Sequence, residues 1–181
     1  MTAYEITAQA IGIVAMAINI LSFQQKNQRT IIIMQLFGAS LFAVNMFMIG
    51  ATMGGFLNLI GAVRALVYSN KERFGTNKPV WVFVFCALYL ASYVLTFAVF
   101  GKEPTAVNFI VEFLPLVGMT ASGIGFYLSD AKAVRRLGMV SSPSWLVYNI
   151  VNFALGGIIC EILCMISIII GMLRLDRTQS K

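Results

Sequence analysis

Residues 141–163 read SSPSWLVYNIVNFALGGIICEIL, a mostly apolar stretch that carries one carboxylate, Glu161. No Lys or Arg lies within ten residues of Glu161 on either side. A helix of about 20 apolar residues crosses a bilayer core, which is about 30 Å thick. An acid in such a segment is costly in lipid and turns toward protein or water. The stretch therefore predicts membrane-embedded helices with a polar interior.

The composition extends this prediction to the whole chain. Of 181 residues, 59% are hydrophobic and 11% are charged, and the mean hydropathy is +0.85. Soluble domains are about 45–50% apolar and about 25% charged. We therefore expect an all-α integral membrane protein, with residues 1–181 as a single membrane domain. The net charge of +6 fits basic loops beside a membrane, so the expected partner is the lipid bilayer and no nucleic acid.

The apolar segments predict seven transmembrane helices, because a lone strand cannot satisfy its backbone hydrogen bonds in lipid. The predicted spans are residues 6–24, 31–50, 52–69, 80–100, 106–127, 137–155 and 157–173. With this count, twelve of the thirteen basic residues fall on one side of the membrane, and Lys102 falls alone on the other. The positive-inside rule then predicts an N-terminus outside and a C-terminus in the cytoplasm.

The order of spans and loops predicts an internal repeat. Residues 6–69 form a first three-helix bundle, 80–100 a linker helix and 106–173 a second bundle, so the plan is a 3+1+3 parallel repeat. A shift of 103 residues pairs Asn58 with Glu161. Identities at this shift are few, so the prediction depends on loop order and on the placement of polar residues.

The polar residues within the spans lie on defined helix faces. Trp145, Tyr148 and Asn149 share one stripe, at the spacing of a helix face. Since lipid cannot hydrogen-bond such groups, we expect the stripes to converge on a central cavity. The predicted substrate-binding residues are Trp145, Glu161, Asn58, Tyr148, Asn149, Asn45 and Glu112. Two alternatives stay open: the Asn residues could join helices, and Glu161 could form a structural ion pair with Arg64.

Catalytic and metal chemistry have little support in the sequence. His is absent, and Cys86, Cys160 and Cys164 lie in apolar segments without a Cys-x-x-Cys motif. A nucleophilic Cys or Ser would lack its His base, and two thiols without a His or acid partner make a poor metal site. We expect no enzyme activity, no metal, no cofactor and no disulfide.

Several segments resemble known membrane families. GAVRALVYS (61–69), SSPSWLVYNI (141–150) and GGIICEI (156–162) look like signatures of the bacterial inner-membrane family called YgjV-like. The 3+1+3 plan resembles the SWEET and PQ-loop superfamily, with LSFQQKNQR (21–29) where that superfamily has its Pro-Gln pair. The resemblance implies a multi-pass protein of the bacterial inner membrane, in which two three-helix bundles enclose a substrate pocket.

The same resemblance implies a transport function. SWEET sugar carriers line their pocket with a Trp and a later Asn, at the spacing that separates Trp145 from Glu161 and Phe42 from Asn58. Because Glu161 stands where those carriers have Asn, a polar or cationic solute, with possible proton coupling, is expected instead of a neutral sugar. The alternative is a receptor or adaptor of the same fold that binds a peptide or small ligand without transport. The chain carries both halves, so a monomer could suffice, with a homodimer as the alternative.

Overall fold

The computed structural model describes residues 3–48, 52–99, 101–151 and 155–176. Across these residues the chain forms eight α-helices, one π-helical turn and no strand, which confirms the all-helical prediction. The elements are α1 (Ala3–Ser22), α2 (Gln28–Met48), α3 (Thr52–Ser69), α4 (Lys71–Phe74), α5 (Val80–Ala98), α6 (Ala106–Tyr127), α7 (Ala131–Val151), α8 (Leu155–Gly171) and the π-helical turn η1 (Met172–Asp176).

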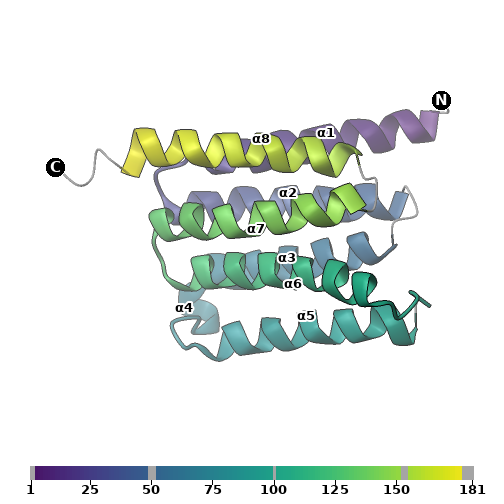
Figure 1. Cartoon of the computed structure of the whole chain (residues 1–181). Coiled ribbons are helices and arrows are strands. Elements are labelled where there is room, and N and C mark those ends of the chain that lie inside the picture. The colour runs from purple at the N-terminus through teal and green to yellow at the C-terminus, as the bar shows by residue number, and fades with distance from the viewer. Residues whose placement is uncertain (1–2, 49–51, 100, 152–154, 177–181) are drawn as a thin grey trace.

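Six of the helices form two layers that face each other (Figure 1). In one layer α2 lies between α1 and α3, and in the other α7 lies between α6 and α8. Across the layers, α1 contacts α8, α2 contacts α7 and α3 contacts α6. The remaining long helix, α5, packs along the edge where α3 meets α6.

This arrangement has the geometry of a two-fold axis that runs along the helices. Half a turn about such an axis carries α1 onto α6, α2 onto α7 and α3 onto α8, with the chain direction preserved. A parallel repeat requires this relation, and the single intervening helix α5 provides it by restoring the chain direction. The division into two bundles and a linker stays a prediction.

Five segments are long and apolar enough to cross a membrane: α1, α2, α5, α6 and the continuous segment Gly156–Asp176. The apolar part of α3, Gly54–Ser69, is shorter, and α7 begins with the basic residues Lys132, Arg135 and Arg136. Both helices nevertheless run alongside the other five (Figure 1). A multi-pass membrane protein is thus supported, and α3 and α7 stay predictions as spans.

The outside of the bundle is apolar, as a lipid-facing surface requires. On α5 and α6, Phe83, Val107 and Ile110 are 71%, 63% and 66% exposed. By contrast, Phe126 and Ile168 are fully buried within the bundle. In water, each Å² of apolar side-chain surface that stays exposed forgoes about 25 cal/mol of stabilisation. In lipid the cost of exposure is small, because lipid tails are as apolar as these side chains. The exposed surface therefore favours a bilayer as the solvent.

The start of α7 differs from the predicted residue 137. α7 begins at Ala131, because the carboxylate of Asp130 accepts hydrogen bonds from the backbone nitrogens of Lys132 (3.1 Å) and Ala133 (3.2 Å). An acid at this position stabilises the first turn of a helix. Arg135, which lies before the predicted start of this span, is only 1% exposed and forms an ion pair with Asp176. The pairing joins residues far apart in sequence, so no local pattern could reveal it.

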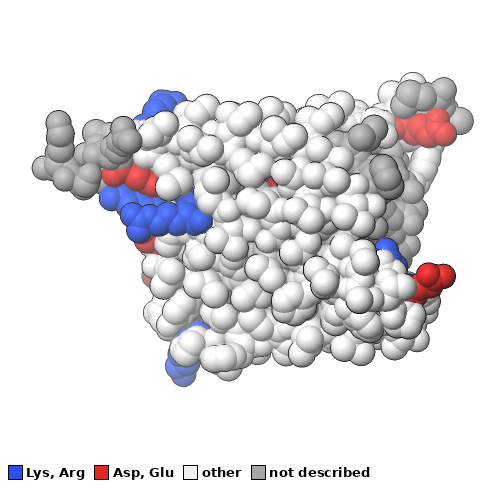
Figure 2. Space-filling view, viewed as in Figure 1, with Lys and Arg blue, Asp and Glu red and all other residues white. Residues whose placement is uncertain are grey.

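Basic residues collect at one end of the bundle (Figure 2). That end carries the α1–α2 joint, α4, the start of α7 and η1. Its basic residues include Lys26, Arg29, Lys71, Arg73, Lys78, Lys132, Arg135, Arg136 and Arg174. The opposite end carries Lys102. We call these the basic end and the opposite end.

The last residue of α8 packs against the chain between α1 and α2. A Cβ atom added at Gly171 would lie 2.5 Å from the backbone oxygen of Phe23, which a helix cannot absorb without moving. We expect Gly171→Ala to destabilise the protein by about 1–3 kcal/mol, the usual cost of overpacking, measured as a lower midpoint of thermal unfolding in detergent. Gly156→Ala is the matched control on α8, since nothing lies within 4 Å of its added Cβ. Equal midpoints for the two variants would contradict the contact.

Candidate functional site

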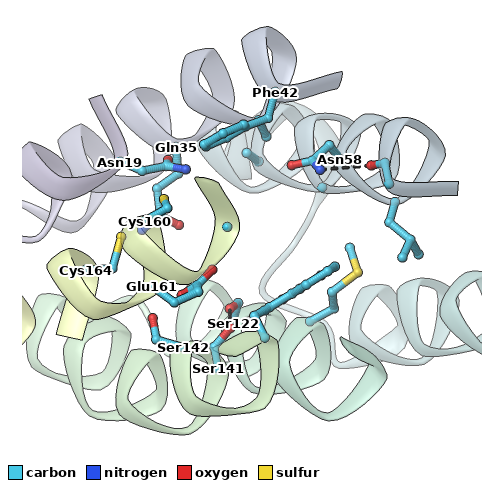
Figure 3. Close-up of a pocket in the computed structure, with 18 of the residues that line it drawn as sticks. Asn19, Gln35, Phe42, Asn58, Ser122, Ser141, Ser142, Cys160, Glu161 and Cys164 are labelled. Carbon is cyan, nitrogen blue, oxygen red and sulfur yellow. Dashed lines mark hydrogen bonds between the residues drawn. The ribbon is translucent and has the colours of Figure 1, made fainter. Parts of the chain in front are cut away.

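A cavity of about 590 Å³ lies between the two layers, and all six helices of the layers contribute to its lining. Figure 3 shows Asn19, Gln35, Phe42 and Asn58 on one side of this space, and Ser122, Ser141 and Ser142 on the other. Cys160, Glu161 and Cys164 come from α8. The two bundles therefore enclose a shared space with a mixed polar and apolar wall.

The lining of the cavity follows the predicted repeat. Nine pairs of residues separated by 103 positions have both members in the cavity wall. These pairs are Asn19/Ser122, Phe23/Phe126, Ala39/Ser142, Phe42/Trp145, Met46/Asn149, Gly54/Gly157, Leu57/Cys160, Asn58/Glu161 and Gly61/Cys164. The two halves thus present equivalent positions to one space, although the side chains at those positions have diverged.

One packing contact recurs in both halves and shows the same relation. A Cβ atom at Gly157 would lie 2.6 Å from the side chain of Asn149, and one at Gly54 would lie 3.2 Å from Sδ of Met46. The two glycines are 103 positions apart, and so are Met46 and Asn149, the side chains that they contact. In each half, the preceding helix can place a side chain beside the cavity, because the glycine opposite has no Cβ atom in the way.

Glu161 is the only acid among the described residues that line the cavity. Ser142 of α7 lines the same cavity. None of the described Lys or Arg side chains forms an ion pair with it. Within the part of the chain that the structure describes, the carboxylate therefore faces the cavity without a counter-ion, which leaves a cationic ligand or a proton as its partner.

Comparison with known proteins identifies the family of this chain. Residues 6–179 match the Imp-YgjV family, described as a bacterial inner membrane protein family. The chain belongs to the Imp-YgjV family. Neither the curated proteins nor the solved structures include a match. The family places this helical bundle in the bacterial inner membrane, whereas the link to the SWEET and PQ-loop superfamily stays a prediction.

In this Imp-YgjV protein, five of the seven predicted site residues line the cavity: Trp145, Tyr148, Asn149, Asn58 and Glu161. Trp145 and Tyr148 pack edge to face, with ring centroids 5.7 Å apart. The side-chain amide of Asn58 donates to the backbone oxygen of Gly54 (2.9 Å), which leaves its own oxygen available to a ligand. The helical stripe on α7 therefore led correctly to the cavity wall.

The structure places Asn45 and Glu112 outside the cavity, so their prediction as lining residues is wrong. Asn45 is buried between α2 and α1, where its amide donates to the backbone oxygen of Ala8 (2.8 Å). Glu112 forms an ion pair with Lys102, at 3.0 Å, near the opposite end. Asn45 thus acts as the helix-joining residue considered from the sequence, and Glu112 has a cation for its partner.

Arg64 does not have the partner that the sequence suggested. It is 8% exposed, so it does not reach the surface, and it forms no ion pair with Glu161. Its Nη1 donates to the Tyr89 hydroxyl (3.0 Å) and to the backbone oxygen of Met119 (2.7 Å). The guanidinium also lies 4.9 Å from the centre of the Phe126 ring. Arg64 therefore fastens α3 to α5 and α6 while lining the cavity.

Sequence reasoning missed several polar residues of the wall. Ser141 and Ser142 line the cavity one turn before Trp145, so extending the stripe of α7 backward would have found them. Ser122 Oγ lies 3.0 Å from Ser141 Oγ and joins α6 to α7. Gln35 also lines the cavity on one stripe of α2 with Ala39, Phe42 and Met46, so extending the stripe backward from Phe42 would have found it.

Hydrogen bonds at the basic end join the two layers, and we call the four side chains that make them the latch: Gln24, Gln28, Arg135 and Ser167. The amide of Gln24 donates to the backbone oxygen (2.5 Å) and to Oγ (2.9 Å) of Ser167. The amide of Gln28 donates to the backbone oxygens of Gly125 (3.0 Å) and Phe126 (2.9 Å). The guanidinium of Arg135 donates to the backbone oxygen of Gln25 (2.9 Å). The hydroxyl of Ser167 donates to the backbone oxygen of Ile20 (2.6 Å). The latch therefore joins the two layers at the basic end.

Proposed function

We propose that the protein is a membrane carrier for a small polar or cationic solute, which crosses through the cavity between the two three-helix layers. One observation supports this most directly: a cavity of about 590 Å³ contains a carboxylate with no counter-ion from the described chain. Binding sites for small molecules typically enclose about 300–1,000 Å³. A purely structural interior would instead close around its polar groups at the usual packing density.

Glu161 gives the cavity its expected selectivity. In a medium of low dielectric constant, an unpaired carboxylate is costly, and a bound cation or proton reduces that cost. A positively charged group of the solute would therefore pair with Glu161, while Asn58 and Asn149 provide hydrogen bonds. A proton could occupy the same carboxylate when the solute leaves, which would couple transport to a proton gradient.

The latch indicates how access would change. In the described arrangement, Gln24, Gln28 and Arg135 hold the layers together at the basic end. Opening that end requires these hydrogen bonds to break, each with a net contribution of about 0.5–1.5 kcal/mol. Solute binding can offset a cost of a few kcal/mol for breaking these bonds, so the two layers could rock about the cavity.

The charge distribution suggests the orientation of this cycle. With the basic end in the cytoplasm, as the positive-inside rule predicts, the latch is a cytoplasmic gate and the N-terminus lies outside. The cavity is lined by both halves of one chain, so a monomer would contain a complete pathway.

Accessibility of a single cysteine tests this function without knowledge of the solute. In a background with Cys86→Ser, Cys160→Ala and Cys164→Ala, we expect Asn58→Cys to react with a membrane-impermeant thiol reagent from either face. The measurement uses intact cells and inverted membrane vesicles. Asn45→Cys is the matched control, because Asn45 is buried between helices outside the cavity, and its labelling should be slow from both faces.

Each outcome of this experiment has a distinct meaning. Labelling of Asn58→Cys from both faces supports alternating access. Labelling from one face alone would contradict a carrier and favour the receptor alternative. Absence of labelling from both faces, in a protein that is inserted and folded, would mean a sealed interior and would remove the basis for transport.

A further inference from the structure

A second cavity, of about 650 Å³, lies at the basic end, away from the proposed transport cavity. It is bounded by the joint between α1 and α2, by the end of α3 with α4, and by the joint between α6 and α7. These segments follow the ends of α1, α3 and α6, of which α1 and α6 are long and apolar enough to cross a membrane. The cavity therefore lies at the depth of the lipid headgroups, where phosphate is the most abundant charged group.

The wall of this cavity carries an excess of positive charge. Four basic residues, Lys26, Arg29, Lys71 and Arg73, line it together with the two acids Glu72 and Asp130. Asp130 is engaged in capping α7 through its bonds to two backbone nitrogens. None of the four basic side chains forms an ion pair with a carboxylate of the described residues. The excess charge therefore has no carboxylate partner among the described residues.

Lys71 is held in place inside this cavity. Its ammonium donates to Oε1 of Gln28 (3.3 Å) and contacts the hydroxyl of Ser129. Gln28 is itself fixed by its two bonds to the backbone of α6. Burial lowers the pKa of Lys71 from its ordinary value, as expected for an ammonium that lacks an anionic partner. The fixed ammonium shares the cavity wall with Lys26, Arg29 and Arg73, and such a cluster of donors suits an anion with several oxygens.

We propose that this basic cavity binds a phosphate group. Phosphate oxygens accept several charge-assisted hydrogen bonds at once, and Arg and Lys are the side chains that provide them. Basic pockets at the ends of membrane helices bind the headgroups of anionic phospholipids in this manner. The phosphate could belong to such a headgroup or to a soluble molecule, and the two sources differ in the following test.

The test compares lipid and free phosphate on the same purified protein. Native mass spectrometry measures retention of phosphatidylglycerol against phosphatidylcholine, and thermal unfolding measures the response to inorganic phosphate against chloride at equal ionic strength. A site for a lipid phosphate retains phosphatidylglycerol preferentially, whereas a site for a soluble phosphate raises the unfolding midpoint with inorganic phosphate. Either result supports the site and identifies its source.

A matched pair of double variants decides whether the cavity itself is responsible. Arg29→Gln with Arg73→Gln removes two charges from the cavity wall, and both side chains are exposed, so the fold should persist. Lys132→Gln with Arg136→Gln removes two charges at the same end but outside the wall. We expect the first variant to weaken phosphate binding about 30-fold and the second by at most about 3-fold. Equal losses in both variants, or no phosphate preference in the wild type, would overturn the proposal.

Discussion

Glu161→Gln should reduce uptake of small cations about 10- to 100-fold in reconstituted vesicles. A hydrogen-bonded contact with a charged group contributes about 1.5–3 kcal/mol, and about 1.4 kcal/mol corresponds to a tenfold change in affinity. Gln preserves the volume of Glu and can still form hydrogen bonds. The substitution therefore removes the charge while leaving the packing of α8 nearly unchanged.

Choline and putrescine serve as charged probes in this measurement, and ribose serves as a neutral probe. Glu112→Gln is the matched control, because it removes an acid whose partner is Lys102 near the opposite end and which does not line the cavity. If the Glu161→Gln variant takes up both cations at the rate of the wild-type protein, Glu161 is excluded from solute binding. Equal losses in the two variants would point to the net charge of the protein rather than to the cavity.

Cross-linking the latch should produce the second large effect. With Gln24→Cys and Ser167→Cys in the cysteine-free background, a short cleavable thiol linker would tie α8 to the chain that follows α1. Since the wild-type side chains are 2.9 Å apart, a short linker spans the two positions. We expect labelling of Asn58→Cys from the basic end to fall more than tenfold, while labelling from the opposite end persists.

Cleavage of the linker provides the internal control for this experiment, since it should restore labelling from the basic end. Linker applied to either single variant should have no effect. Labelling from the basic end that persists after complete cross-linking would show that the latch is not a gate. Carrier function would then require a different route to the cavity.

Membrane character and helical structure were predictable because they depend on composition and segment length. An apolar segment such as 80–100 can form only a helix in lipid, whatever its neighbours do. The stripe of Trp145, Tyr148 and Asn149 was equally predictable, because side chains on one face of a helix are related by local geometry. The structure places all three in the cavity wall.

Partners of buried charges were not predictable in the same way. The sequence suggested Arg64 as a partner for Glu161, yet Arg64 turns toward Tyr89 and Met119. Glu112 and Glu161 both lie within apolar helices, but Glu112 lies beside Lys102, and Glu161 faces the cavity. The direction that a long side chain takes depends on which helices pack beside it, and that packing is a property of the whole bundle.

The sequence by itself determined that this chain forms membrane helices, that its basic residues collect at one end and that polar positions recur at a spacing of 103 residues. These properties follow from local composition and from the period of the helix, so they are independent of how the helices pack. The tertiary structure alone decided that α1 faces α8 and that α3 faces α6. Only this pairing encloses one shared cavity, leaves Glu161 without a counter-ion among the described residues and assigns Asn45 and Glu112 to structural contacts, because burial and pairing depend on neighbours distant in sequence.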